Sequence, residues 1–412
     1  MKIDVLVIGG GSAGMSAGIK AYESGASVLI VERENKLGGI LKQCIHNGFG
    51  LKYFKKEMTG PEYAHALEEK VNKLDIKVLT GTMVTGLSKK ADGSFAVSVI
   101  SKNGAYIINA KAIVLAMGCR ERPSAAISLC GERPVGVLTA GCAQKIINID
   151  GQMIGKKVVI IGSGDVGLIM ARRLHYEGAK VEGVYEISST PSGLNRNIVQ
   201  CLNDYNIPLH LSETAVEIIG KDRVEGVVVA KVNPDFTFNM KTKRLIKCDT
   251  VLLSVGLVPE NDLVSNLIKL NNTTGGAVVD DYYMTNIEGI FSCGNVLHVH
   301  DIVDDVTIEA EQAGLFAGQF ALGNLNKGVK FNTISGNGVR YLVPNFVHAG
   351  SGFVSLKFRV TKTFKNPKIV ATCGNEIIGE RSAKILLPAQ MEQIMIDRSK
   401  LKGDVKVEVY EG

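Results

Sequence analysis

The stretch 5-VLVIGGGSAGMSAG-18 decides the fold of the first part of the chain. It starts within a nearly continuous apolar run, residues 3–8, which is typical of a buried parallel strand. Gly9, Gly11 and Gly14 then fit the spacing G-x-G-x-x-G. In that spacing the first glycine allows a tight turn, the second lets backbone approach a pyrophosphate, and the third lets a helix pack closely on the strand. The stretch therefore predicts a strand, a turn and a helix that hold a dinucleotide.

The residues after this fingerprint complete a dinucleotide-binding unit. We expect a helix from about Ser12 to Ser24, whose first N–H groups, including that of Ala13, would face the phosphates. A second strand, 27-SVLIVE-32, ends in Glu32, whose carboxylate can accept a hydrogen bond from a ribose hydroxyl. A glycine fingerprint alone is weak evidence, and an ordinary glycine-rich turn is the alternative. Strand, glycines, helix, strand and acid in this order are specific for a nucleotide site.

The same order recurs in 158-VVIIGSGDVGLIMARR-173, followed by the strand 180-KVEGVYE-186. The residues expected to bind a second nucleotide there are Gly162, Gly164, Asp165, Gly167 and Glu186. An acid at the end of that strand favours NAD(H) over NADP(H), because it accepts from a 2′-hydroxyl and repels a 2′-phosphate. The following 187-ISSTPSG-193 offers no Arg or Lys to a phosphate. The alternative is that Glu186 is a solvated strand end.

An apolar strand ending in glycine follows each fingerprint, as 112-AIVLAMG-118 and 249-DTVLLSVG-256. In the first copy it comes after an expected hairpin, residues 95–110, which turns at Asn103–Gly104. The two halves therefore share one order of elements, and we interpret them as an internal duplication.

The segments 33-RENKLGGIL-41 and 59-TGPEYAHALEEKVNKLDIKVLTG-81 resemble the two-dinucleotide-binding flavoproteins, in particular their thioredoxin-reductase-like branch. The resemblance implies that the first nucleotide is FAD. It also implies FAD contacts from residues beyond the fingerprint: Arg33, Gly38, Gly39, Gly118, Gly294 and Asn295. In the family pattern T-x-x-x-G-[IV]-[FY]-x-x-G-D, which 285–295 follows, the last acid is here Asn295. An amide can still bond a ribityl hydroxyl, without charge.

The sequence thus predicts an α/β fold with two Rossmann-like domains. We expect a discontinuous FAD-binding domain at residues 1–122 and 262–327, and an inserted NAD-binding domain at residues 123–261. A helix from about Val306 to Leu322 carries small residues that would pack closely, with its N-terminus toward the flavin. The tail, residues 328–412, shows little helix and predicts a small all-β domain that serves as an interaction module. Its short strand patterns lie at 339–347, 353–360, 368–373, 376–380 and 405–411.

The eight cysteines are scattered, and none forms a C-x-x-C motif. In the resembled branch a cysteine pair sits shortly before the second fingerprint, where this chain has only Cys142. One cysteine cannot form the intramolecular disulfide that thiol exchange requires. Cys44, with His46 close by in sequence, is the candidate for a single reactive thiol at the flavin face. The alternative is that Cys44 is a packed residue lining the cofactor.

The segment 298–305 contains two histidines and three aspartates, which could ligate a metal. The alternative, which we favour, is a loop and helix start beside the flavin, with no metal. The composition is that of a globular protein, with 45% hydrophobic residues and a net charge of +6 spread along the chain. No basic and aromatic cluster predicts nucleic-acid binding, and no apolar run reaches the roughly 18 residues of a transmembrane helix. Unpaired cysteines favour a reducing, cytoplasmic location.

Further stretches, 44-CIHNGFG-50, 117-MGCRERP-123 and 295-NVLHVHDIVDDVTIEAEQAG-314, resemble a narrower group. It is the FAD/NAD-linked subunit associated with anaerobic glycerol-3-phosphate dehydrogenase-type flavoproteins, related to subunits of amine, opine and hydrogen-cyanide-forming oxidases. The resemblance implies an electron-relay subunit in an oligomer, with a partner dehydrogenase flavoprotein and a small cysteine-rich electron-transfer protein.

Two other functions stay open beside this relay between FAD and NAD(H). One is a self-sufficient NADH-dependent reductase of peroxide, disulfide or a small acceptor that uses Cys44. The other is a module that senses NADH without turnover.

Overall fold

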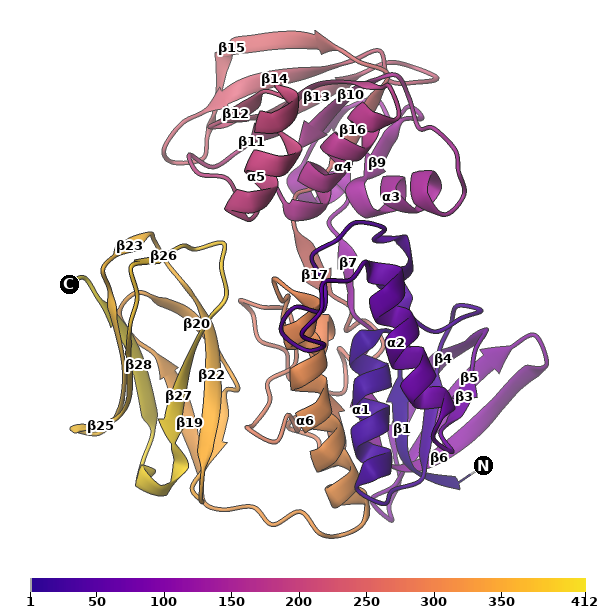
Figure 1. The fold of residues 1–412 in the computed structure, drawn as a ribbon, viewed down its shortest axis with the longest axis vertical. Helices are drawn as coiled ribbons and strands as arrows, with labels where there is room; N and C mark the ends of the chain where they lie inside the picture. The colour runs from indigo at the N-terminus through magenta and orange to yellow at the C-terminus, as the bar shows by residue number, and fades with distance from the viewer. Residues whose placement is uncertain (1) are drawn as a thin grey trace. The chain divides into compact units, whose positions relative to one another are not determined.

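The computed structural model describes residues 2–412 and forms two compact units. The first unit joins the chain up to Cys119 with Pro259–Gly412, and the second is Arg120–Val258 (Figure 1). These divisions fall within a few residues of the predicted boundaries at 122/123 and 261/262. The predicted tail domain, 328–412, lies in the first unit. The fold is the expected α/β fold with Rossmann-like sheets.

A seven-stranded sheet forms the centre of the first unit, in the order β3-β2-β1-β6-β5-β4, with β18 paired to β6. Its strands are β1 (Lys2–Ile8), β2 (Val28–Val31), β3 (Lys77–Leu79), β4 (Thr82–Lys89), β5 (Phe95–Ser101), β6 (Gly104–Leu115) and β18 (Ile290–Ser292). Strands β1, β2, β3, β18 and the end of β6 run parallel, whereas β4, β5 and the start of β6 are antiparallel. The first fingerprint therefore follows a central strand whose last four residues are buried.

One prediction about this sheet was wrong. The second hairpin strand and the closing strand 112–118 are a single strand, β6. Its first half pairs with β5, from Gly104 opposite Ser101 to Ala110 opposite Phe95, and its second half pairs with β1. The sequence suggested two strands because the exposed first half alternates in polarity while the buried second half is continuously apolar.

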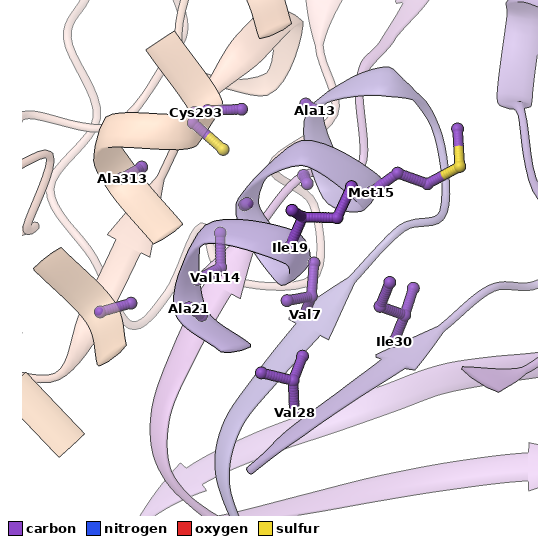
Figure 2. Close-up of a cluster of buried hydrophobic side chains, with 14 of the residues drawn as sticks. Val7, Ala13, Met15, Ile19, Ala21, Val28, Ile30, Val114, Cys293 and Ala313 are labelled. Atoms are coloured by element: carbon purple, nitrogen blue, oxygen red, sulfur yellow. The ribbon is translucent and has the colours of Figure 1, made fainter. Parts of the chain in front are cut away.

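Three long helices cover the sheet of the first unit: α1 (Ser12–Glu23), α2 (Gly60–Asn72) and α6 (Val303–Ala321). Figure 2 shows the core beneath α1, where Met15 and Ile19 lie close to Val7 and Ile30 from the sheet. Small residues face α1 from α6, as predicted. A Cβ on Gly314 would collide with the carbonyl oxygen of Ala17. The two helices therefore touch backbone to backbone, which fixes the start of each relative to the other.

The second unit repeats the architecture with a five-stranded parallel sheet, in the order β12-β11-β10-β16-β9, and a four-stranded sheet, β15-β14-β13-β8. Its strands are β7 (Cys119–Glu121), β8 (Cys130–Gly131), β9 (Val137–Thr139), β10 (Lys157–Ile161), β11 (Lys180–Glu186), β12 (Leu209–Leu211), β13 (Glu213–Ile219), β14 (Gly226–Val232), β15 (Phe238–Lys247), β16 (Thr250–Leu253) and β17 (Leu257–Pro259), where β7 and β17 lie at the chain crossings. Its helices are α3 (Ala140–Asn148), α4 (Asp165–Tyr176) and α5 (Asn195–Cys201).

The tail forms two facing sheets, β21-β19-β28-β24-β25 and β20-β22-β27, and a short pair, β23-β26. Its strands are β19 (Lys330–Ser335), β20 (Val339–Val343), β21 (Phe346–His348), β22 (Phe353–Val360), β23 (Phe364–Lys365), β24 (Lys368–Cys373), β25 (Glu376–Ser382), β26 (Ile385–Leu386), β27 (Glu392–Asp397) and β28 (Val405–Tyr410). Both sheets contribute to one hydrophobic core that contains no residue from the Rossmann-like part. The tail is therefore a β-sandwich with its own core.

Candidate functional site

The first fingerprint has the geometry that its glycines predict. Gly9 has a φ of 106°, and a Cβ there would collide with the carbonyl of Ala116. A Cβ on Gly14 would collide with the carbonyl oxygen of Gly9. A Cβ on Gly11, by contrast, would meet nothing within 4 Å. The chain's own packing thus demands the outer two glycines, and the middle glycine borders open space that a pyrophosphate fits.

The start of α1 also fits an anionic group. No side chain within residues 2–412 caps this helix, whose N-cap is Gly11. The first N–H groups, those of Ser12 and Ala13 among them, therefore lack a side-chain acceptor at the positive end of the helix dipole. The buried carboxylate of Glu32 lies beside this turn and accepts the N–H of Gly10 at 2.6 Å. Its other oxygen accepts from Glu34 N at 2.8 Å, and a carboxylate can accept further bonds from a ribose.

The paired glycines of the 33–41 segment pack against the fingerprint. The N–H of Gly38 donates to Gly10 O at 2.8 Å, and a Cβ on Gly39 would lie 3.2 Å from the Cα of Gly11. Both glycines have positive φ, 110° and 54°. Arg33, by contrast, is exposed, with its Nε 3.9 Å from the carboxylate of Glu34. The structure therefore brings Gly38 and Gly39 to the predicted nucleotide site and leaves Arg33 on the surface.

The strand β18 returns to the same place. A Cβ on Gly294 would lie 2.9 Å from the Cβ of Ala13, at the first turn of α1. The neighbouring Asn295 accepts the N–H of His300 at 3.0 Å and donates to the thiol of Cys119 at 3.7 Å. Its amide oxygen keeps a lone pair for a ribityl hydroxyl. Gly118 has a φ of 74° and open space where a Cβ would be. Residues predicted from distant segments thus converge at one end of the sheet.

The aspartates and the histidines of the segment 298–305 have separate partners in the structure. Asp304, buried in the first turn of α6, accepts from the backbone N–H groups of Gly50, Lys52 and Tyr53 at 2.7–3.1 Å. Asp301 accepts from Arg359 at 2.6 Å, and Asp305 pairs with Lys52. The three aspartates therefore hold loops and the tail rather than sharing a ligand site.

The two histidines of that segment meet Glu309 instead. The possible ligand atoms of His298, His300 and Glu309 lie within 4.8 Å of one another, and all three residues are buried. However, the ammonium of Lys357, from β22, lies 2.7 Å from Glu309 Oε2. A cation thus already contacts the carboxylate oxygen that a metal would use.

Cys44 follows a short 3-10 helix, Gly39–Gln43, and donates to Ile40 O at 3.3 Å. Burial raises the pKa of the Cys44 thiol to about 12, which favours the thiol over the reactive thiolate at neutral pH. The ring of His46 lies 5.0 Å from that of Phe49, and its Nδ1 lies 2.9 Å from Asn47 O. None of the eight cysteines, all within the described residues, forms a disulfide.

The second fingerprint is closed by a residue that the sequence analysis missed. Ser254, just after β16, donates its hydroxyl to Gly164 O at 3.2 Å and accepts the N–H of Gly167 at 3.1 Å. A Cβ on Gly162 would collide with the Ser254 carbonyl oxygen. The serine thus fixes the turn before α4. The sequence offered one indication of this role: Ser254 stands at the end of the apolar strand 249–256, which closes the second fingerprint unit.

Glu186 is buried in the second unit rather than being a solvated strand end. Its carboxylate accepts from Ser163 N at 2.9 Å, from the Ser163 hydroxyl at 2.5 Å and from Ser188 N at 3.0 Å. The solvated alternative was therefore wrong. Asp165, at the start of α4, accepts from Leu194 N at 2.8 Å and from the Asn197 amide at 2.7 Å. This carboxylate anchors the next helix, and direct contact with a nucleotide stays a prediction.

The structure thus contains two glycine-fingerprint turns. Each turn follows a buried parallel strand and has a buried acid beside it, and the segment that holds both turns matches a known family model. Residues 3–314 match the family described as pyridine nucleotide-disulphide oxidoreductase. The chain belongs to this family. Members are FAD-dependent, NAD(P)H-linked oxidoreductases, which establishes the enzyme class and the cofactor types expected from the sequence.

Curated relatives cover most of the Rossmann-like part. The chain is 27% identical over 297 residues to a subunit of alkyl hydroperoxide reductase from Staphylococcus aureus (strain NCTC 8325 / PS 47), a match that covers 71% of this chain. It spans about half, 54%, of the length of that relative. It is 25% identical over 343 residues to hydrogen cyanide synthase subunit HcnB from Pseudomonas protegens, which covers 78% of this chain and 70% of that protein.

Solved structures confirm the fold. Thioredoxin reductase from T. acidophilum matches with a TM-score of 0.64 and 23% identity, covering 78% of this chain and 99% of that one. Bacillithiol disulfide reductase from Bacillus cereus matches with a TM-score of 0.63 and 20% identity, covering 79% and 100%. The thioredoxin-reductase-like architecture expected from the sequence is thereby confirmed, and these likenesses concern the fold alone. No helix in residues 2–412 is both long and apolar enough to cross a membrane.

Proposed function

We propose that the chain is an NADH-dependent flavoprotein oxidoreductase that passes electrons to an acceptor outside its own cysteines. The observation that supports this most is the arrangement of cysteines. The family is named for disulphide chemistry, yet no two of the eight cysteines of this chain form a C-x-x-C motif, and only Cys142 lies shortly before the second fingerprint. A dithiol relay within the chain therefore lacks its components.

The residues of the first unit would hold FAD. The α1 N-terminus and Gly11 would bind the pyrophosphate, Glu32 the ribose, and Asn295 the ribityl chain. When bound, FAD accepts a hydride from a reduced nicotinamide and passes the electrons on. In the second unit Glu186 would select NAD(H), since its carboxylate would repel a 2′-phosphate.

The class of the electron acceptor distinguishes two forms of the proposal. In the first, the reduced flavin serves peroxide, a disulfide of another protein or a small acceptor. The match to alkyl hydroperoxide reductase favours this form. The proposed role of Cys44 is separable, because Cys44→Ser abolishes turnover only if that thiol takes part.

The decisive experiment is an anaerobic titration of the purified protein with NADH, followed by the flavin absorbance. We expect one equivalent of NADH to bleach the flavin and NADPH to do so far less. Adding hydrogen peroxide, a small disulfide and a quinone in separate samples then identifies the acceptor class by the rate at which absorbance returns. Protein that carries flavin but does not bleach with either nucleotide would contradict the proposal and favour a sensing module.

The second form is a relay subunit of a glycerol-3-phosphate dehydrogenase-like complex, with a partner flavoprotein and a small cysteine-rich carrier. The match to HcnB supports it, because this match covers 78% of this chain and 70% of that protein, more of both than the match to alkyl hydroperoxide reductase; both relatives are named as subunits. Neither of the two curated relatives named above is a glycerol-3-phosphate dehydrogenase subunit. Bleaching by NADH but not by glycerol 3-phosphate is the outcome that both forms expect, whereas bleaching by glycerol 3-phosphate alone excludes the relay. We also propose that the protein is cytoplasmic and that it forms an oligomer.

A further inference from the structure

Four buried polar residues connect the tail sandwich to the predicted flavin loop. Glu309 lies on the buried side of α6, and the nitrogen atoms of three side chains lie within 3.2 Å of its Oε2 atom. They are His298 Nε2 at 2.8 Å, His300 Nε2 at 3.2 Å and Lys357 Nζ at 2.7 Å. Its other oxygen accepts the backbone N–H of Gly294 at 2.8 Å. One carboxylate therefore bridges the tail's lysine and the residue next to Asn295.

We propose that Lys357 is a positioning residue for the flavin: acting through Glu309, it sets the charge and the conformation of the 294–300 loop. This inference rests on the proposed function, since it takes Gly294 and Asn295 to lie at the flavin. It assigns the tail a role in the redox site, beyond that of an interaction module.

The charge balance of the cluster supports the proposal. Burial opposes the charged form of Glu309, but its interactions with Lys357 and the two histidines outweigh burial and hold the pKa of Glu309 well below its usual range. Burial lowers the pKa of His298 to about 4, so that its ring is neutral at pH 7. Lys357, whose ammonium lies 2.7 Å from Glu309 Oε2, is the nearest counter-ion of the buried carboxylate. Removing one partner of such a pair leaves an uncompensated charge in the interior.

The hydrogen bonds of the histidines leave a ring nitrogen that can take up a proton when the charge of the cluster changes. An ionised Glu309 can only accept, so His298 must donate from Nε2. The Nδ1 atoms of both His298 and His300 are buried and have no partner among the described residues. If Lys357 loses its charge, the His298 ring can take up a proton in its place. The imbalance would then appear as a raised histidine pKa.

The other groups around the cluster are neutral or already paired. Tyr283 and Cys293 face Glu309, and burial raises the pKa of each well above its usual value. Arg359, on the same strand as Lys357, pairs with Asp301 instead. On the outer side Lys357 borders a polar cavity of about 220 Å³ that Lys52, Asp305, Arg381 and Glu392 also line. Of the four cluster residues, Lys357 is the one that lines this cavity.

The test compares Lys357→Met with Lys357→Arg and with Arg359→Met. The arginine variant keeps the charge, and Arg359→Met removes a tether from the same strand to the same loop without touching Glu309. In Lys357→Met we expect the flavin redox equilibrium to move at least tenfold toward the oxidised form at pH 8, about 30 mV for a two-electron couple. The extra buried negative charge opposes flavin reduction, whereas the two controls should stay near wild type.

Two further variants test the direction in which the cluster's charge shifts the flavin reduction potential. Glu309→Gln leaves Lys357 unbalanced and should shift the potential upward, and the double variant Lys357→Met/Glu309→Gln should return it toward wild type. If Lys357→Met fails to fold, the double variant and Glu309→Gln still decide the matter. A Lys357→Met shift no larger than that of Arg359→Met overturns the proposal, because Lys357 would then act only as a tether.

A second readout does not depend on flavin. In protein labelled on histidine, NMR titration should show the His298 pKa rising by about one unit or more in Lys357→Met. This can be measured on flavin-free protein, so it separates the two levels of inference. A protein that binds no flavin but shows the raised pKa refutes the proposed function and not the cluster. An unchanged His298 pKa overturns the cluster itself.

Discussion

At the residue scale, the reactivity of the cysteines follows from their burial. Cys130 and Cys142 are exposed, whereas burial raises the pKa of Cys44 to about 12. Because the thiolate is the reacting species, brief treatment with iodoacetamide at pH 7.5 should alkylate Cys130 and Cys142 well before Cys44. Peptide mass spectrometry measures the order. Denatured protein is the control, in which the three should react alike, and early labelling of native Cys44 would instead support the single-thiol reductase.

The choice of nucleotide is also decided by single residues. In Glu186→Ala with Ser188→Arg, the repelling carboxylate is replaced by a cation that can bond a 2′-phosphate. A hydrogen bond to a charged group contributes about 1.5–3 kcal/mol. The NADPH/NADH ratio of kcat/KM should therefore rise at least about tenfold. Glu186→Ala alone is the control. A wild-type preference for NADPH would show that the interpretation of Glu186 is wrong.

The sequence predicted residues whose role is local and missed those whose partner is distant. Gly9, Gly11 and Gly14 could be assigned because the fingerprint spacing itself carries the geometry. Glu309 offered a signal, since it is an acid in line with Ala313 and Ala317 on the buried side of α6. Lys357 offered none: alternation along β22 places it outside the sandwich core, and only tertiary structure brings it to α6.

At the element scale, the packing of α1 on α6 can be tested at Gly314. Alanine favours a helix over glycine by about 1 kcal/mol, but its Cβ would collide with the backbone of Ala17. Overpacking of this kind costs about 1–3 kcal/mol, and a backbone atom cannot move aside as a rotamer can. Gly314→Ala should therefore lower the free energy of unfolding in urea. The matched control is Gln312→Ala at an exposed position of α6, which should change it by less than about 0.5 kcal/mol.

Elements were predicted well where their polarity pattern was uniform along their length. In the tail, β22 and β24 have the predicted limits because both alternate cleanly or are flanked by turns. The predicted strand 339–347 is instead two strands, β20 and β21, with Pro344 between them. Proline cannot donate to a ladder, which explains the break. β19 and β27 were missed because at least half of the residues in each strand are polar.

At the scale of the whole molecule, two buried groups give the pH dependence of stability opposite signs. Burial lowers the pKa of His298 to about 4, below its ordinary value of 6.5. Between these values the unfolded chain binds more protons, so this residue's contribution is lost as pH falls from 6.5 to 4. Burial raises the pKa of Asp280 from 3.8 to about 6. Over that window the folded chain binds more protons, so acidification stabilises the fold at this residue and partly offsets the loss.

The two effects separate in variants, each by at most about 1.4 kcal/mol per pH unit within its window. His298→Gln keeps a donor for Glu309 and removes the titrating ring, so unfolding free energies in urea should fall less than wild type between pH 6.5 and 4. Asp280→Asn removes the offset, so the same series should fall more steeply. His65→Gln is the control, because that ring is largely exposed and should leave the slope unchanged. A His298→Gln slope equal to that of wild type would mean that the ring is already protonated in the fold. Glu309 would then be balanced by histidine rather than by Lys357, and the tail would lose its assigned part in the redox site.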